Sequence, residues 1–171
     1  MIRPVSGTRK SAERLTIERV HRPPSDLLVE LEKYEMEAFG ETGLRTYDLV
    51  VMAEAGAVFL AYLGEEFVGG CQLLRMIDEP DFFYLVGFYV RPGWQGRSLG
   101  KAFLLGVADE IETLGGEGMV LTVAPDNKRA LKLYQSVGFV CESLVPHFYG
   151  KGHDRHILRW RFERGDLHGS V

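Results

Sequence analysis

Cysteine is scarce in this sequence of 171 residues, and the two that occur, Cys71 and Cys141, do not form a spaced group. Disulfide-built secreted domains and cysteine metal sites need several cysteines at short, regular spacing. The sequence therefore excludes a disulfide scaffold and predicts a reducing environment. Because both cysteines fall within apolar, strand-like runs, we expect two buried free thiols.

Long hydrophobic runs and an excess of one charge are also missing. No apolar run approaches the roughly 20 residues that span a bilayer, and the first ten residues carry no apolar signal core. The formal net charge is −4, which gives no general attraction to nucleic acid or to anionic membranes. We therefore expect a cytoplasmic protein, monomeric or homodimeric, with neither nucleic acid nor membrane as a partner.

The length suits one domain with a substantial core. Residues 1–12 are polar and are predicted to form a flexible tail, which leaves 13–171 as a single domain. Hydrophobic periodicity within that domain predicts seven strands and four helices. The strands are expected at 15–20, 57–63, 67–76, 82–90, 119–123, 139–145 and 156–162, and the helices after Ser25, at 47–55, from Ser98, and after Asn127.

This order of elements predicts an α/β (α+β) fold. Hairpins come first and a strand–helix–strand unit follows, so the sheet should be mixed, with helices on both faces. Residues 82–90 are so apolar that we expect a central strand buried on both sides. Ser25 is predicted to cap the first helix.

A turn suited to an anion follows that central strand. Residues 90–101 run from a strand through Gly96 and Gly100 into a helix, so backbone N–H groups converge at a helix N-terminus, as phosphate binding requires. A nucleotide-hydrolysing loop is excluded because Gln95 and Ala102 stand where glycine and a hydroxyl residue are needed. Ser98 likewise breaks the dinucleotide pattern. The alternative is a helix start that merely follows a tight turn.

A second motif downstream resolves that ambiguity. This second motif comprises Asn127, Ala130, Tyr134, Gly138 and Phe139. Together with Gln95, Ser98 and Gly100 of the first motif, these residues make the chain resemble the GNAT superfamily of acetyltransferases. The resemblance implies a single-domain GNAT-like fold whose mixed, mostly antiparallel central sheet contains a splayed pair of strands. The last hairpin, with Phe148 and Tyr149, is similar to that of ribosomal-protein N-terminal acetyltransferases.

The resemblance also implies roles for individual residues toward acetyl-CoA as the acyl donor. Tyr134 would protonate the departing CoA thiolate, which a tyrosine hydroxyl can do without itself being charged. Packing on the apolar face of its helix is the structural alternative for this residue. The amides expected to hold the pyrophosphate are those of Gln95, Gly96, Arg97, Ser98, Leu99, Gly100 and Lys101. The residues expected along the rest of the cofactor are Phe88, Tyr89, Val90, Asn127 and Ala130.

The acceptor side departs from the family pattern. Where some branches carry a general-base glutamate, this chain has Tyr84 and Thr122, so no base is identified. Candidate acceptor residues are Glu35, Phe39, Tyr84, His147 and Tyr149. The acidic run that contains Glu35 would either attract a cationic acceptor or form the solvated face of a helix. The histidines lack ligand spacing, so we expect no metal.

The resulting hypothesis is direct transfer of an acetyl group from acetyl-CoA to an amine. An α-amino group of a peptide or protein is favoured, and a small polyamine or amino-sugar amine comes next. The alternative from a different class is a catalytically idle acyl-CoA-binding sensor or partner-binding module.

Overall fold

The computed structural model describes residues 14–163, so the predicted tail at 1–12 lies outside the described residues. The seven strands and four α-helices follow the predicted order, with short 3₁₀ turns η1 (Gly40–Thr42) and η2 (Pro92–Trp94) between them. The strands are β1 (Leu15–Val20), β2 (Ala57–Leu63), β3 (Glu66–Arg75), β4 (Phe82–Val90), β5 (Gly118–Val123), β6 (Val140–Val145) and β7 (Arg155–Arg161). The helices are α1 (Ser25–Phe39), α2 (Thr46–Ala55), α3 (Leu99–Thr113) and α4 (Lys128–Val137).

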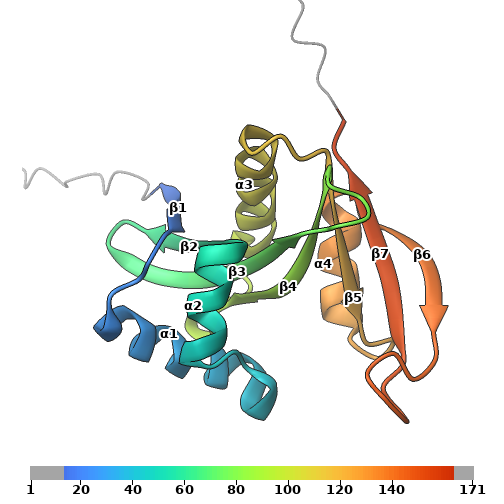
Figure 1. Cartoon of the computed structure of the whole chain (residues 1–171), viewed down its shortest axis with the longest axis horizontal. Helices are drawn as coiled ribbons and strands as arrows, with labels where there is room; N and C mark the ends of the chain where they lie inside the picture. Colours follow the sequence, from blue (N-terminus) through green and yellow to red (C-terminus); the bar gives the residue numbers. More distant parts are fainter. Residues whose placement is uncertain (1–13, 164–171) are drawn as a thin grey trace, which may run out of the picture.

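One seven-stranded sheet runs through the molecule in the order β1-β2-β3-β4-β5-β7-β6 (Figure 1). The β4–β5 pair is parallel and the other pairs are antiparallel. The parallel pair is short, since only Phe82–Tyr84 of β4 pairs with Gly118–Val120 of β5. Beyond Tyr84 the two strands part, which confirms the mixed, mostly antiparallel sheet with a splayed pair.

Helices cover both faces of this sheet, as predicted. On one face Phe103 and Ile111 of α3 and Tyr134 of α4 pack with Phe59 and Leu121 of the strands. On the other face residues of α1 and α2 pack against β2, in a cluster of Leu28, Leu31, Leu49, Met52, Ala53, Val58 and Leu60. Burying one such large apolar side chain contributes roughly 1.5–3 kcal/mol to folding, so these two clusters hold the helices on the sheet.

The structure differs from the sequence prediction at three places. Ser25 does not cap α1 but is its first residue, and the preceding residue provides no side-chain cap. Cys141 is exposed, because β6 lies at the edge of the sheet. Val86, in the middle of β4, is 38% exposed, because β5 has already departed there. Cys71 is buried as expected.

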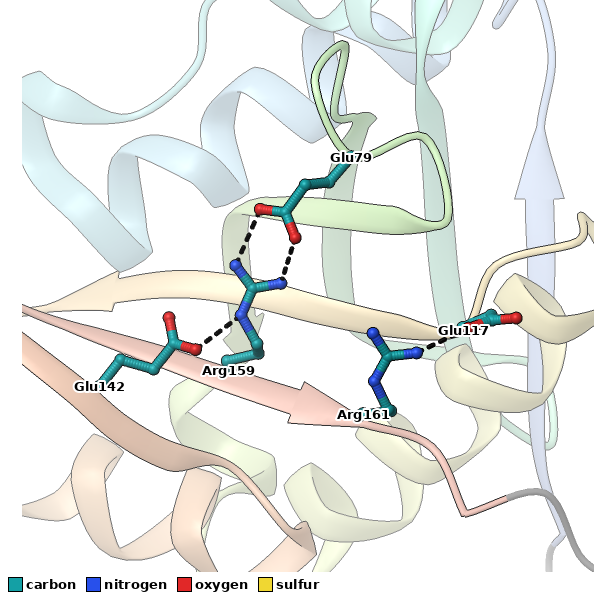
Figure 2. Close-up of polar contacts among 5 residues, drawn as sticks. All are labelled: Glu79, Glu117, Glu142, Arg159 and Arg161. Atoms are coloured by element: carbon teal, nitrogen blue, oxygen red, sulfur yellow. Dashed lines mark hydrogen bonds and ion pairs between the residues drawn. The ribbon is translucent and has the colours of Figure 1, made fainter.

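Arginines of β7 form ion pairs with glutamates of neighbouring segments (Figure 2). Arg159 donates from its two terminal nitrogens to both carboxylate oxygens of Glu79, each at 2.9 Å, and from Nε to Glu142 at 2.8 Å. The Arg159 guanidinium also lies 4.4 Å from the ring centroid of Phe82. These contacts connect β7 both to the turn before β4 and to β6. They lie close to the short parallel pairing of β4 with β5.

Candidate active site

A cavity of about 560 Å³ opens where β4 and β5 part. Past Tyr84 the backbone of β4 has no partner on β5, so one edge of that strand can pair with an extended ligand. Of the predicted cofactor residues, all but Arg97 line the cavity. They are Phe88, Tyr89, Val90, Gln95, Gly96, Ser98, Leu99, Gly100, Lys101, Asn127 and Ala130.

The turn at one end of the cavity presents free backbone N–H groups at the start of α3. Leu99, Gly100 and Lys101 are the first three residues of α3, so their N–H groups have no acceptor inside the helix and form the positive end of its dipole. The turn needs left-handed backbone at Gly96 (φ 77°) and Ser98 (φ 60°). Such exposed N–H groups at a helix start suit a phosphate or pyrophosphate.

Gln95 stabilises the turn mainly through its side chain. Its Nε2 donates to the Val90 carbonyl at 2.8 Å, and its Oε1 accepts from Arg129 at 2.8 Å. Its backbone N–H is already used within the turn, where it donates to Pro92 at 3.3 Å. Arg129 also lines the cavity, together with Lys132. Neither cation belongs to the second motif, although both lie on α4 beside its residues.

Asn127 has a structural role that its motif did not reveal. Its Oδ1 accepts from the Ala130 N–H at 3.1 Å, which caps α4. Such a cap contributes about 1 kcal/mol to the stability of the helix. Because Asn127 also lines the cavity, its amide NH₂ is the remaining donor for a ligand.

Tyr134 combines a packed ring with a place in the cavity wall. The residue is 8% exposed, and its ring lies 5.5 Å from that of Phe139 and 6.4 Å from that of Phe88. Burial, with a smaller effect from nearby Cys71, raises the pKa of Tyr134 well above its usual value. The hydroxyl therefore stays protonated. It has no hydrogen-bond partner within residues 14–163 and is available as a donor.

Three hydroxyl groups meet where β4 and β5 part. Those of Tyr84 and Thr122 lie 3.3 Å apart, and that of Tyr149 lies 3.3 Å from the first and 3.2 Å from the second. Burial raises the pKa of Tyr84 to about 12, so the group stays neutral. We call Tyr84, Thr122 and Tyr149 the hydroxyl cluster. In the sequence, Thr122 is notable only because it stands where some family members carry a general-base glutamate.

The other acceptor candidates lie in different environments. Phe39, 37% exposed, lines the cavity, and its ring stands edge-on to Tyr89 at 5.8 Å. Glu35 is only 1% exposed and accepts hydrogen bonds from Gln72 and from the Leu44 N–H. His147 shapes the β6–β7 hairpin, since its Nδ1 accepts from the Gly152 N–H at 3.0 Å.

The remaining glutamates of the acidic run mostly serve the local structure. Glu32 accepts from the Thr46 N–H at 2.8 Å and from the Thr46 hydroxyl, and so joins α1 to the start of α2. Glu30 accepts from the Tyr34 hydroxyl at 2.9 Å. Within residues 14–163 no group of three or more His, Cys, Asp or Glu side chains is placed to hold a metal. None of the helices described is long and apolar enough to cross a membrane.

Known proteins resemble this chain in sequence and in fold. The model of the acetyltransferase (GNAT) family matches residues 21–139. The N-alpha-acetyltransferase RimI of Mycobacterium tuberculosis is 29% identical over 137 residues, which cover 79% of this chain and 80% of that protein. The [ribosomal protein bS18]-alanine N-acetyltransferase of Salmonella typhimurium is 33% identical over 85 residues, covering 48% of this chain.

Several of these relatives are longer than the matched region. The match spans 55% of the Salmonella protein, and 32% and 26% of two other curated relatives. Among solved structures, Arabidopsis thaliana NAA60 in complex with acetyl-CoA superposes with a TM-score of 0.72 at 18% identity, covering 87% of this chain and all of the other. At that identity the likeness is one of fold. The family match over residues 21–139 shows that the chain belongs to the GNAT acetyltransferase family.

Proposed function

We propose that this protein transfers an acetyl group from acetyl-CoA directly to an amine. The observation that carries the proposal is the cavity at the splayed strands, with an anion-binding turn at one end and Tyr134 in its wall. Relatives named as N-acetyltransferases and a structural neighbour solved with acetyl-CoA support the same function.

The residues present fit the chemistry of acetyl-CoA. The free N–H groups at the start of α3, with Arg129 and Lys132 nearby, suit its pyrophosphate. The unpaired edge of β4 suits the amide groups of its pantetheine arm. Phe88 and Tyr134, which line the cavity beyond the β4–β5 ladder, would hold the acetyl thioester.

The chain's own groups then account for the proton transfers. The neutral amine attacks the thioester carbonyl carbon, a C–N bond forms, and the C–S bond breaks. Backbone N–H groups of β4 polarise the carbonyl, and the Tyr134 hydroxyl gives its proton to the departing thiolate and regains one from water. The proton lost from the amine leaves through water held by the hydroxyl cluster.

We favour a peptide or protein α-amine as the acceptor. The hydroxyl cluster offers no carboxylate, and Tyr84 has a raised pKa, so a strong base is missing there. An α-amine with a pKa of ~7.7 is substantially neutral near pH 7.4, whereas deprotonating a lysine amine with a pKa of ~10.4 at that pH costs roughly 4 kcal/mol. A small polyamine or amino-sugar amine is the second candidate. Cytoplasmic location and a monomeric or homodimeric state stay predictions.

Calorimetric titration with acetyl-CoA, CoA and ATP tests the donor. We expect micromolar binding of acetyl-CoA and none of ATP, and absence of acetyl-CoA binding would overturn the proposal. Mass spectrometry then tests the acceptor, with one peptide bearing a free N-terminus and no lysine and a matched peptide with a blocked N-terminus and one lysine. Acetylation of the first peptide is expected, and acetylation of only the second would contradict the α-amine assignment.

A further inference from the structure

Glu35 links three parts of the chain from a buried position. It belongs to α1, its Oε2 accepts from the Leu44 N–H at 3.2 Å, and its Oε1 accepts from Gln72 Nε2 at 2.8 Å. Leu44 lies in the segment between α1 and α2, and Gln72 lies on β3. A buried carboxylate is costly unless it is hydrogen-bonded, so these two bonds determine where Glu35 and its two partners lie.

Gln72 extends this link to β4. It is 1% exposed and pairs with Gly87, while the next residue of β3 pairs with Leu85, so Val86 forms a bulge. A Cβ atom on Gly87 would lie 2.5 Å from Gln72 Oε1 and 3.8 Å from Phe39 Cε2. The Gln72 side chain and the Phe39 ring therefore both rest on the backbone of β4 beside the bulge.

The orientation of the Gln72 side-chain amide lowers the stability of the folded protein. Its Oε1 is buried without a hydrogen-bond partner, and such an atom costs about 1–3 kcal/mol. The amide keeps this orientation because Glu35 is an acceptor that takes up its NH₂ group. An unsatisfied buried atom in a native structure calls for an explanation, and here the atom lies beside Gly87 of β4.

We propose that Glu35 is a positioning residue for the acceptor amine: through Leu44 it holds the segment that follows Phe39, and through Gln72 it holds the part of β4 at Gly87 on which the Phe39 ring rests. Glu35 itself does not touch the amine, because it is buried. The inference rests on acetyl transfer as the proposed function, but not on which amine is used.

The state of Glu35 should depend on pH near neutrality. Burial raises its pKa to about 7, against the lowering effect of its bonds to Leu44 and Gln72. The titratable groups that face it are Cys71 on β3 and Tyr89 on β4. Burial, with an added effect of Glu35, raises the pKa of each well above its usual value, so both stay neutral. Between pH 6 and 8 Glu35 is therefore the group of this cluster that changes charge.

Steady-state kinetics of Glu35→Gln test the inference, with Glu32→Gln as the matched control. Glu32 also lies on α1 and bonds to the start of α2, but it does not reach Gln72. We expect Glu35→Gln to raise the KM for the amine at least fivefold at pH 8, with kcat and the acetyl-CoA Kd within twofold of wild type. The ratio of variant to wild-type KM should shrink toward pH 6, where Glu35 is already protonated. An unchanged KM, or a KM and acetyl-CoA Kd that rise together, would overturn the inference.

A measurement that needs no acceptor separates this inference from the proposed function. In the wild-type protein, hydrogen exchange at the Leu44 amide, corrected for the intrinsic effect of pH, should be slower at pH 8 than at pH 6. The same amide in Glu35→Gln should show no such change. Equal protection of Leu44 at both pH values in wild type would overturn the inference even if the enzyme is active, and the expected change would support it even if peptide amines prove not to be substrates.

Discussion

Ser98 adopts a backbone conformation that is unfavourable for serine. Its φ of 60° lies in the left-handed region, where a side chain costs roughly 1–2 kcal/mol compared with the right-handed region. The preceding left-handed residue, Gly96, has no such cost. The turn thus keeps the shape that exposes the first N–H groups of α3, at the expense of stability.

Ser98→Gly should stabilise the protein by roughly 0.5–1 kcal/mol. Removing the left-handed penalty outweighs the greater flexibility that glycine gives the unfolded chain. Urea unfolding at pH 7 measures the change, with Ser136→Gly as control. Ser136 lies within helix α4, so glycine at this position should destabilise the protein by a similar amount. A destabilising Ser98→Gly would show that the Ser98 side chain supports the turn.

Tyr134→Phe should separate chemistry from binding. The phenylalanine ring keeps the packing against Phe88 and Phe139, while the proton donor is lost. We expect kcat to fall about 100-fold and the acetyl-CoA Kd to stay within threefold, as measured by release of free CoA and by calorimetry. Because the pKa of Tyr134 is raised, wild-type activity should show no loss from this group below about pH 10.

Tyr62→Phe, on β2, is the control for loss of a tyrosine hydroxyl outside the cavity and should leave kcat unchanged. An unchanged kcat in Tyr134→Phe would show that Tyr134 contributes only through the packing of its ring. If neither wild type nor Tyr134→Phe turns over while both bind acetyl-CoA, the sensor alternative would replace the enzyme.

At the scale of elements, the short β4–β5 ladder joins the two halves of the sheet. Only three residues of each strand pair, and β7 reinforces the joint through Arg159 and its two carboxylates (Figure 2). These ion pairs are partly exposed, so solvent screens them and each contributes little to stability. Close backbone packing at the joint should therefore matter more than these charges.

Gly118→Ala should destabilise the protein by about 2–3 kcal/mol. A Cβ atom at Gly118 would collide with the Trp160 carbonyl oxygen and with the Phe82 ring, and crowding of this kind costs about 1–3 kcal/mol. Gly93→Ala is the control, because a Cβ atom there meets open space. Denaturant unfolding of both variants measures the difference. Equal stability of the two would show that the backbone where β4 pairs with β5 can shift to accommodate the added methyl group.

At the scale of the whole molecule, Glu35 couples folding to pH. Its folded-state pKa of about 7 lies above its ordinary 4.5, so the folded protein favours the protonated form. The associated stability is fully present below pH 4.5 and is lost as pH rises through 7. The total loss is as much as about 3 kcal/mol, because each pH unit between the two pKa values contributes about 1.4 kcal/mol. An ionised Glu35 thus lowers stability while, in our proposal, it positions the acceptor side.

Glu35→Gln should remove this pH dependence. The difference in unfolding free energy between the variant and wild type should grow in favour of the variant from pH 5 to pH 8, as followed by urea denaturation. Glu32→Gln should keep the wild-type slope. A difference independent of pH would mean that Glu35 keeps an ordinary pKa in the folded protein.

The order of elements, the anion-binding turn and the position of Tyr134 could be predicted because their signals are local. Apolar periodicity marks strands and helices within a few residues, and the Gln95–Gly100 and Asn127–Phe139 motifs each occupy one turn or one helix. The sequence was therefore enough to predict the family, the fold class and most of the selected residues that line the cavity.

The acceptor side depended on contacts between residues far apart in the chain. The hydroxyl cluster joins Tyr84 with Tyr149, 65 positions apart, and the Glu35–Gln72 bond spans 37. In sequence Glu35 is one glutamate among several, and Cys141 lies in an apolar run like that of Cys71. Glu35 is buried because its face of α1 meets β3, and Cys141 is exposed because β6 lies at the edge of the sheet. Only the tertiary structure decides those relations, because desolvation depends on neighbours that local sequence does not specify.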